Sequence, residues 1–384
     1  MFNDARFETT DSRGWIAASY ERSIGSATVS ARGYYDYYDY FGAYPYAEGD
    51  DVIVGDDSSR MDMVGGEVSM RRTFWKRHAM TFGLEQRNNL RQDQAYIYGG
   101  VPDIDDHRST REFAGFVQDE IALNRRWTAI VGARYDWWTH KGSTGRPRLG
   151  LIYHTDYDTA VKVLYGEAYR VPNMYELYYY SSSGGSAAAT QLEPESLRTT
   201  EVVFEQYLRG RLRLSATGYF TWIRDLIDST LTEDEEILHV NQESVRARGI
   251  ELEAESRLAS GVLLRGSFAI QDTEEKQSQV DLSNAPHQLA TMQISVPVWR
   301  HQLRFSSDTS FVAWRYTVSG EHLPSYWLSN ATVTYEPVRS PLTFGASLYN
   351  LFDAEYAHPV GLEFAQPAIQ QDGRTFAVRA GVRF

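Results

Sequence analysis

The sequence predicts an all-β fold, an antiparallel transmembrane β-barrel, and three observations support this. Apolar and polar residues alternate with a period of two along most of the 384 residues, which is the period of a strand and not of a helix. The strand segments are about 10 to 13 residues long, whereas strands of soluble sheets have about five or six. Short connections alternate with long polar ones, as in outer-membrane barrels.

The alternation is clearest in residues 211–222. Leu212, Leu214 and Phe220 fall on one face of this segment, and Arg213 falls on the other. Residues 249–258 and 262–270 divide in the same way. Counted by this criterion, the chain contains about seventeen strands, one per roughly 22 residues.

Short turns separate the two strands of each pair. They have the sequences ERSIG, LNRR, HTDYD, LRGR, RLASG and VWRH. The links between pairs are mostly longer and polar. A soluble propeller or β-sandwich would also contain many strands, but it has no reason to sort its connections by length.

The two faces of the strands indicate different surroundings. One face carries aliphatic and aromatic residues and the other carries charged and polar ones, which fits a wall with lipid outside and a wet or plugged interior. We expect these apolar residues to face outward: Leu212, Leu214, Phe220, Phe376 and Val378. Trp127 and Trp137 bracket one strand, as expected of the aromatic belts at a membrane interface.

Composition excludes several classes of protein. A formal charge of −13 argues against broad, unspecific binding to nucleic acid or to an anionic membrane. The absence of cysteine excludes disulfide scaffolds, thiol catalysis and Cys-ligated zinc. No apolar run reaches the roughly 18 residues of a transmembrane helix, and the opening residues do not resemble a signal peptide.

Two tyrosine-rich segments are candidate ligand-binding loops, because amphipathic rings of low rotamer entropy suit recognition. They are residues 34–51 and residues 174–195. The candidates are Tyr37, Tyr38, Tyr40, Tyr44, Tyr46, Tyr178, Tyr179 and Tyr180. The alternative for the first segment is an aromatic belt that continues into an outer loop.

No motif predicts a catalytic, metal or cofactor site. Acidic residues cluster at residues 103–107 and at Asp56 and Asp57, but their spacing matches no EF-hand, so we expect solvated loop charge. The chain has no HExxH pair, GxSxG elbow, GxGxxG turn or P-loop. If the protein is an enzyme, a Ser, a His and an acid that are distant in the sequence would have to come together in the folded structure.

Six segments resemble the barrel of the TonB-dependent outer-membrane receptors, in the family's order. They are FVQDEIAL with RWTAIVGARYD, AYRVPNMYELY, LEPESLRTTEVVFE, VRARGIELEAE, NLFDAEYAHP and GRTFAVRAGVRF. Tyr169 and Val171 depart from the family's Phe-Arg-Ala-Pro segment. In the last segment the resemblance implies that Phe376, Val378 and the terminal Phe384 form the signal that the barrel-assembly machinery reads.

The resemblance also implies a transporter of a scarce nutrient, such as siderophore-bound iron or cobalamin, in the outer membrane of a Gram-negative bacterium. Barrels of this class have 22 strands, so residues 1–384 are expected to form one partial barrel domain. About five strands, a plug domain and a signal peptide would precede it. The plug would connect the receptor to the TonB complex, and the ligand would be a small metal chelate. Two alternatives remain: a passive porin or adhesin barrel, and a soluble carbohydrate-binding β protein.

Overall fold

The computed structural model describes residues 4–155, 157–181, 186, 187, 189, 191–234, 236–276, 281–299, 302–362 and 364–383. This part of the chain contains 21 strands and one short helix, α1 (Met174–Tyr178). Four strands have only two or three residues. Seventeen long strands remain, and every pairing with a recorded register is antiparallel, which confirms the predicted fold class. No helix among the described residues is long and apolar enough to cross a membrane.

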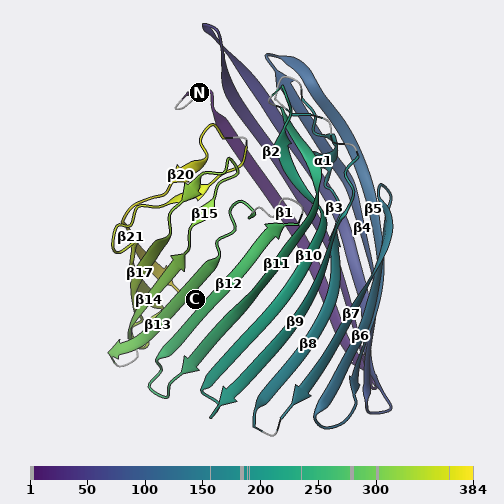
Figure 1. Cartoon of the computed structure of the whole chain (residues 1–384), viewed down its shortest axis with the longest axis vertical. Helices are drawn as coiled ribbons and strands as arrows, with labels where there is room; N and C mark the ends of the chain where they lie inside the picture. The colour runs from purple at the N-terminus through teal and green to yellow at the C-terminus, as the bar shows by residue number, and fades with distance from the viewer. Residues whose placement is uncertain are drawn as a thin grey trace. The chain divides into compact units, whose positions relative to one another are not determined.

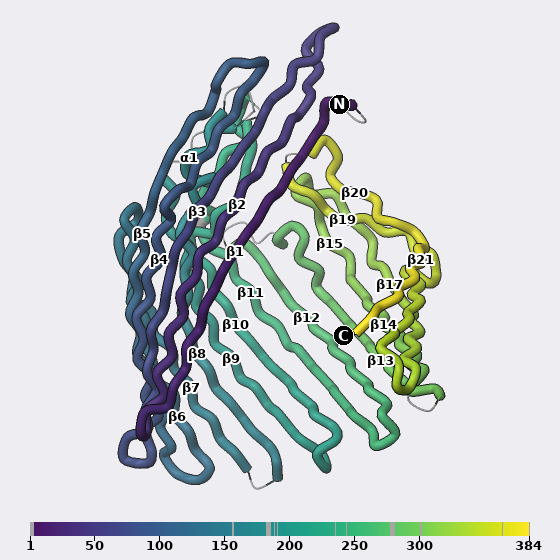
Figure 2. The backbone as a smooth tube through the Cα atoms, turned by 180° about the vertical axis from the view of Figure 1, so that it is seen from behind, coloured from purple at the N-terminus to yellow at the C-terminus, as the bar shows by residue number. Residues whose placement is uncertain are grey.

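The chain divides into two compact units. The first comprises Met1–Leu151, Tyr165–Arg198 and Ile223–Glu243, and the second comprises the rest. The first unit holds β1 (Glu8–Ile24), β2 (Ala27–Glu48), β3 (Asp51–Phe74), β4 (His78–Tyr98), β5 (Val101–Ala122) and β6 (Trp127–Trp138). Each of these strands pairs with the next one along the chain, and Figures 1 and 2 show β1 to β5 side by side.

The second unit is also a ladder of consecutive strands. It holds β12 (Leu263–Glu275), β13 (Gln288–Trp299), β14 (Leu303–Val312), β17 (Tyr326–Tyr335), β18 (Leu342–Tyr349) and β21 (Thr375–Val382), with the small pairs β15 (Arg315–Tyr316) with β16 (His322–Leu323) and β19 (Ala357–Pro359) with β20 (Ala368–Gln370). Five strands contribute residues to both units: β7 (Gly142–His154), β8 (Thr159–Arg170), β9 (Glu195–Leu208), β10 (Leu212–Leu231) and β11 (Ile237–Arg257).

The predicted strand length of about 10 to 13 residues is wrong for the first five strands, and also for β10 and β11, which have 20 and 21 residues. Strands β1 to β5 have 17 to 24 residues, and only Gly49 and Asp50 separate β2 from β3. Residues 34–51 are therefore not a loop. Strand β2 continues through its tyrosines because each residue keeps a partner on β3, as far as Glu48 opposite Asp51, and tyrosine favours extended structure.

The register confirms that the strands have two unlike faces. Val68 of β3 lies opposite Leu84 of β4, and both side chains are more than half exposed. The adjacent residue Glu85 lies on the other face, where its carboxylate pairs with Arg134 of β6 at 2.8 Å. The same alternation exposes Leu214, Phe220, Phe376 and Val378, as predicted, whereas Leu212 is half-buried.

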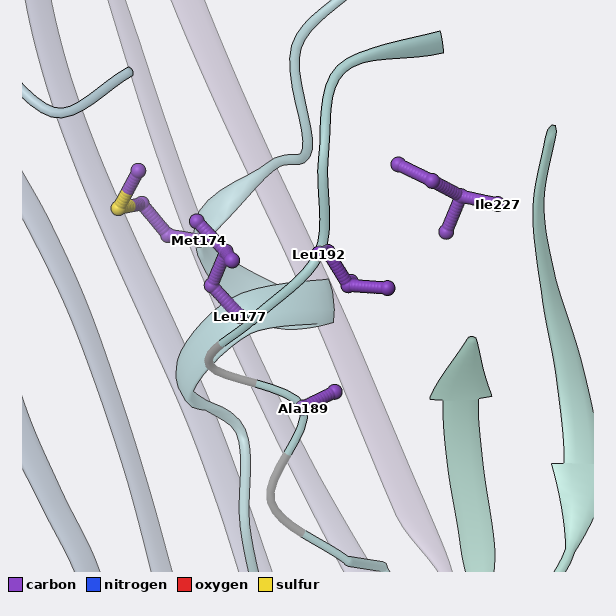
Figure 3. Packing of buried hydrophobic residues seen from close by; sticks show 5 residues of the cluster. All are labelled: Met174, Leu177, Ala189, Leu192 and Ile227. Atoms are coloured by element: carbon purple, nitrogen blue, oxygen red, sulfur yellow. The ribbon is translucent and has the colours of Figure 1, made fainter. Parts of the chain in front are cut away.

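The one cluster of buried apolar side chains in the described residues surrounds α1. Met174 and Leu177 of the helix pack with Ala189 and Leu192, which follow it, and with Ile227 of β10 (Figure 3). Leu177 is 1% exposed. This cluster fixes the segment between β8 and β9 within the first unit.

Candidate ligand-binding site

Helix α1 begins at a capping box. The Asn173 side chain accepts a hydrogen bond from the Glu176 backbone N–H, and the Glu176 carboxylate accepts one from the Asn173 N–H, both at 2.8 Å. Arg170, the last residue of β8, pairs with Glu176 at 2.8 Å and with Glu195, the first residue of β9, at 2.7 Å. The segment between these strands is thus fixed at both ends. These contacts stabilise a five-residue helix, which is too short to be stable in isolation.

Three contacts connect α1 and the residues after it to the long strands. The Gln94 amide of β4 donates to the Met174 carbonyl at 3.2 Å. The Ser181 hydroxyl donates to Asp103 of β5 at 2.6 Å. The guanidinium carbon of Arg108 lies 3.3 Å from the centre of the Tyr178 ring, a cation–π contact. Gln94 lies on the same strand face as Asp57 and Tyr96, so α1 covers the polar face of these strands.

A group of tyrosines gathers on that same face. Tyr44 lies opposite Gly55, which lies opposite Tyr98, and residues directly opposite share a face. The rings of Tyr46 and Tyr98 are 6.0 Å apart, and those of Tyr175 and Tyr179 are 4.6 Å apart. We call this group the tyrosine wall: Tyr40, Tyr44, Tyr46, Tyr96, Tyr98, Tyr175 and Tyr179.

Two glycines let these rings lie against the strands. A Cβ atom at Gly55 would collide with the Tyr96 ring, and one at Gly42 would collide with Tyr40 and Tyr44. Tyr96 is consequently only 2% exposed. The wall therefore depends on the absence of side chains at the two positions that its rings cover.

Asp57 supplies a carboxyl group to the tyrosine wall. A membrane-crossing strand needs roughly ten residues, and Asp57 lies on the part of β3 that exceeds this length. Burial raises the pKa of Asp57, while a hydrogen bond from Tyr179 and the Ser58 N–H act in the opposite direction. Burial and the charge of Asp57 raise the pKa of Tyr179, so its phenol stays a donor. The prediction of solvated loop charge is wrong for Asp57, because this residue belongs to β3, is half-buried and accepts a hydrogen bond from Tyr179.

The structure separates the eight predicted binding residues. Tyr40, Tyr44, Tyr46 and Tyr179 belong to the wall. Tyr38 shares its face but donates to Asp11 at 2.5 Å. Tyr37 lies on the opposite face, where its ring contacts Arg60 and its hydroxyl donates to Asp39.

The remaining two, Tyr178 and Tyr180, flank Tyr179. Tyr178 packs under Arg108 and against the buried cluster. Tyr180 is half exposed. Within the part of the chain that the structure describes, neither ring pairs with a tyrosine of the wall, so the wall contains four of the eight predicted residues.

Sequence reasoning missed three members of the wall and its carboxyl group. Tyr96 and Tyr98 form a Tyr-x-Tyr pair directly before Gly99 and Gly100, and Tyr44 and Tyr46 form another that ends three residues before Gly49. The glycines that follow each pair predict two hairpin turns with tyrosines near them. Tyr175 and Asp57 carry no such signal, because only the fold brings them together.

The other acidic residues form pairs and not a metal site. His107 lies 3.0 Å from both Asp93 and Asp105, and Asp106 pairs with Arg108 at 2.8 Å. Among the described residues, no group of three or more His, Asp or Glu side chains is arranged to hold a metal ion.

The candidate assembly strand is β21. It pairs with β18 along its whole length, from Thr375 opposite Tyr349 to Val382 opposite Leu342. Phe376 and Val378 are more than three-quarters exposed. Phe384 lies outside the described residues, and the role of this strand in assembly stays a prediction.

Comparison with known proteins places this geometry in a family. The family model described as "TonB dependent receptor-like, beta-barrel" matches residues 2–351. The vitamin B12 transporter BtuB of Vibrio cholerae serotype O1 is 25% identical over 285 residues, which cover 72% of this chain and 44% of that protein. An iron-regulated outer membrane virulence protein of the same organism is 22% identical over 339 residues, 80% of this chain and 49% of the relative. The chain thus spans about half the length of these relatives.

Solved structures agree with this fold. The copper transporter OprC superposes with a TM-score of 0.79 at 16% identity, covering 99% of this chain and 66% of OprC. The ferric yersiniabactin uptake receptor FyuA from Yersinia pestis superposes with a TM-score of 0.78 at 15% identity, covering 98% of this chain and 62% of FyuA. At these identities the likeness shows the fold alone, whereas the family model spans most of the sequence. The chain belongs to the TonB-dependent receptor β-barrel family.

Proposed function

We propose that this chain is the barrel portion of an outer-membrane receptor that takes up a scarce nutrient in a Gram-negative bacterium. The substrate class is a metal chelate, such as a ferric siderophore, or a corrinoid. The names of the similar proteins support this class, since they include a vitamin B12 transporter and a ferric yersiniabactin uptake receptor. The family consists of transport receptors and not of enzymes, so we expect the ligand to be bound and moved without a chemical reaction.

The tyrosine wall is the observation that carries the proposal. It offers ring faces, phenol hydroxyls and the carboxyl of Asp57 on the face that α1 covers. Rings with polar tips bind large, partly planar ligands by stacking and hydrogen bonding at low cost in side-chain entropy. We infer that the ligand contacts this wall before it moves inward.

We propose that a plug domain and further strands precede this segment in the complete protein, and that the TonB complex acts on the plug. The barrel-assembly machinery would recognise β21. These proposals rest on the family and on the exposed apolar residues Phe376 and Val378.

Uptake by whole cells tests the proposal. A strain without the gene, and the same strain complemented with the full-length protein, would be supplied with labelled vitamin B12, ferric yersiniabactin or ferric citrate. We expect the complemented strain to accumulate one of them, and an uncoupler of the inner-membrane proton gradient to abolish the accumulation. Diffusion of unrelated small solutes that persists with the uncoupler would favour a passive pore.

The membrane location has its own test, because the chain contains no cysteine. Leu84→Cys and Glu85→Cys place a single thiol on opposite faces of β4. In protein embedded in outer membrane, we expect a lipid-soluble maleimide to label Cys at position 84 and a water-soluble maleimide to label it at position 85. Equal labelling of both by the water-soluble reagent would contradict a lipid-facing apolar surface.

A further inference from the structure

The two ends of the long hairpins carry opposite charge. Residues 33–59, at the β2–β3 end, contain seven Asp or Glu and no Lys or Arg, and residues 92–107, at the β4–β5 end, contain four acids and no Lys or Arg. Residues 70–78, which connect β3 to β4 at the other end, contain four Lys or Arg and no acid. Residues 121–128, between β5 and β6, contain two Arg and no acid. We call residues 70–78 and 121–128 the short-turn edge.

Three basic side chains at this edge, Arg72, Lys76 and Arg77, differ from those on the polar strand face, whereas Arg71 pairs with Glu120 at 3.0 Å. On that face, arginines pair with carboxylates, for example Arg134 with Glu85 at 2.8 Å and Arg146 with Glu167 at 3.2 Å. Arg72, Lys76 and Arg77 are exposed, and within the described part of the chain no carboxylate lies within 4.0 Å of them. Their charge is therefore available to an external anion.

An exposed aromatic ring stands among these cations. Trp75 is 82% exposed and adopts a φ of 47°, and Lys76 follows with a φ of 61°. Residues other than glycine rarely adopt this left-handed backbone conformation. The strain persists only where the surrounding structure imposes it. The Trp75 ring contacts Phe74 and, edge-on, His78, at centroid distances of 6.0 and 5.6 Å.

The cations adjoin the apolar strand face. Arg72 lies opposite Met80, two residues along from Met70 opposite Phe82, so these four side chains share a face. Along this face an apolar band is followed by a cation, and the exposed Trp75 ring and two further cations lie in the turn beyond it. That sequence of surfaces matches the boundary between hydrocarbon and headgroups, where tryptophan is enriched and Lys or Arg bind anionic lipid.

We propose that the short-turn edge binds anionic phospholipid headgroups of the membrane leaflet that it meets. The apolar band beside Arg72 favours a lipid over a soluble anion, and the acidic opposite end of the hairpins restricts the attraction to this edge. The inference rests on the membrane location under the proposed function. It assigns to Arg72, Lys76 and Arg77 a partner that nutrient uptake does not require.

Lipid retention by the purified protein tests the inference. The protein would be mixed with equal amounts of phosphatidylglycerol and phosphatidylethanolamine in a zwitterionic detergent, and the lipids that copurify would be measured by mass spectrometry. We expect the wild type to enrich phosphatidylglycerol. In the triple variant R72Q/K76Q/R77Q, the ratio of bound phosphatidylglycerol to bound phosphatidylethanolamine at low salt should fall about fivefold for each charge removed, until the two lipids are retained equally. The matched control R72K/K76R/R77K keeps the charges and should retain the enrichment.

Two results would overturn the inference. One is unchanged enrichment in R72Q/K76Q/R77Q, and the other is equal retention of both lipids by the wild type. In either case, lipid that copurifies with the protein would still support the proposed membrane location. Retention of neither lipid by any variant would contradict the membrane location itself.

Discussion

The first five strands and the last six long strands differ in their length and in how they are connected. A strand needs about 9 to 11 residues to cross a bilayer. Strands β1 to β5 exceed this by six residues or more. Two-residue turns join β2 to β3 at Gly49–Asp50 and β4 to β5 at Gly99–Gly100. The long strands from β12 to β21 have 8 to 13 residues and are joined at one end by long connections, such as residues 350–374.

This difference shows that two kinds of hydrogen bond stabilise the two regions. In the long hairpins each added residue gains a partner on the neighbouring strand, so the backbone hydrogen bonds are satisfied by the ladder. A long connection has at most a short ladder, such as β19 with β20, and depends more on particular side chains. Asn350 is an example: it is 5% exposed and bonds through its side-chain amide to both the N–H and the carbonyl of Ala354. We therefore expect the two regions to respond differently to substitution.

The largest effect is expected in the connection after β18. Asn350→Ala removes both bonds to Ala354 and places alanine at a φ of 47°. We expect a loss of about 2 to 4 kcal/mol in the free energy of unfolding, because the half-buried N–H and carbonyl of Ala354 lose their partners and alanine is strained at a positive φ. Denaturant unfolding of the protein in detergent would measure it.

The matched substitution in the long hairpins is Asp50→Ala, in the exposed turn after β2. Its effect should stay within about 0.5 kcal/mol. Equal destabilisation by the two substitutions would remove the distinction between ladder and connection.

A second effect tests what the ladder itself requires. Gly65 of β3 lies opposite Tyr34 of β2, whose ring occupies the space that a Cβ would need. We expect Gly65→Ala to destabilise by about 1 to 3 kcal/mol through overpacking. Gly33→Ala is the control, since a Cβ there would meet nothing within 4 Å, and it should unfold at nearly the wild-type denaturant concentration.

A third, smaller effect concerns the connection that holds α1. This segment belongs to the first unit but, like the last connections, it depends on side-chain bonds. Asn173→Ala removes the cap and should destabilise the helix by about 1 kcal/mol, whereas Asn173→Asp should retain most of it. Hydrogen exchange of residues 174–181 would report the change, and identical exchange in all three proteins would argue against the capping box.

The smallest expected effect is the pH dependence from Asp57. Its raised pKa means that the folded state binds the proton more tightly than the unfolded state. Stability should therefore rise as pH falls through the folded pKa and level off below the unfolded value of 3.8. Asp57→Asn should lack this component, so the difference between wild type and variant in thermal midpoint should depend on pH between neutrality and pH 4. A constant difference would contradict a covered carboxyl.

The sequence predicts the strands within the membrane better than their extensions. Lipid on one face and a polar interior on the other force an alternation that can be read directly, as at Leu84 and Glu85. With the membrane location that we propose, both faces of the strand extensions meet water, and composition there does not distinguish a paired strand from a loop. The Gly-Asp and Gly-Gly turns were visible and indicate hairpins, so residues 34–51 could have been predicted as strand.

The site shows the same limit. Once β2 is a strand, alternation alone separates Tyr37 from Tyr38 and Tyr40. The capping box at Asn173 and Glu176 also has a sequence signature. The contact between Tyr179 and Asp57 has none, because it joins residues more than 120 positions apart through burial that only the fold creates.

Ligand binding by face-matched tyrosine variants tests the account most directly. The affinity of the purified full-length receptor would be measured for the labelled substrate that cells accumulate. We expect Tyr40→Ala and Tyr179→Ala each to weaken binding about tenfold or more, because each removes a ring and a hydroxyl from the wall. Tyr37→Ala, on the opposite face of the same strand, should leave the affinity unchanged. Weakening by Tyr37→Ala equal to that of Tyr40→Ala, or wild-type affinity in both wall variants, would contradict the tyrosine wall as the place where the ligand is captured.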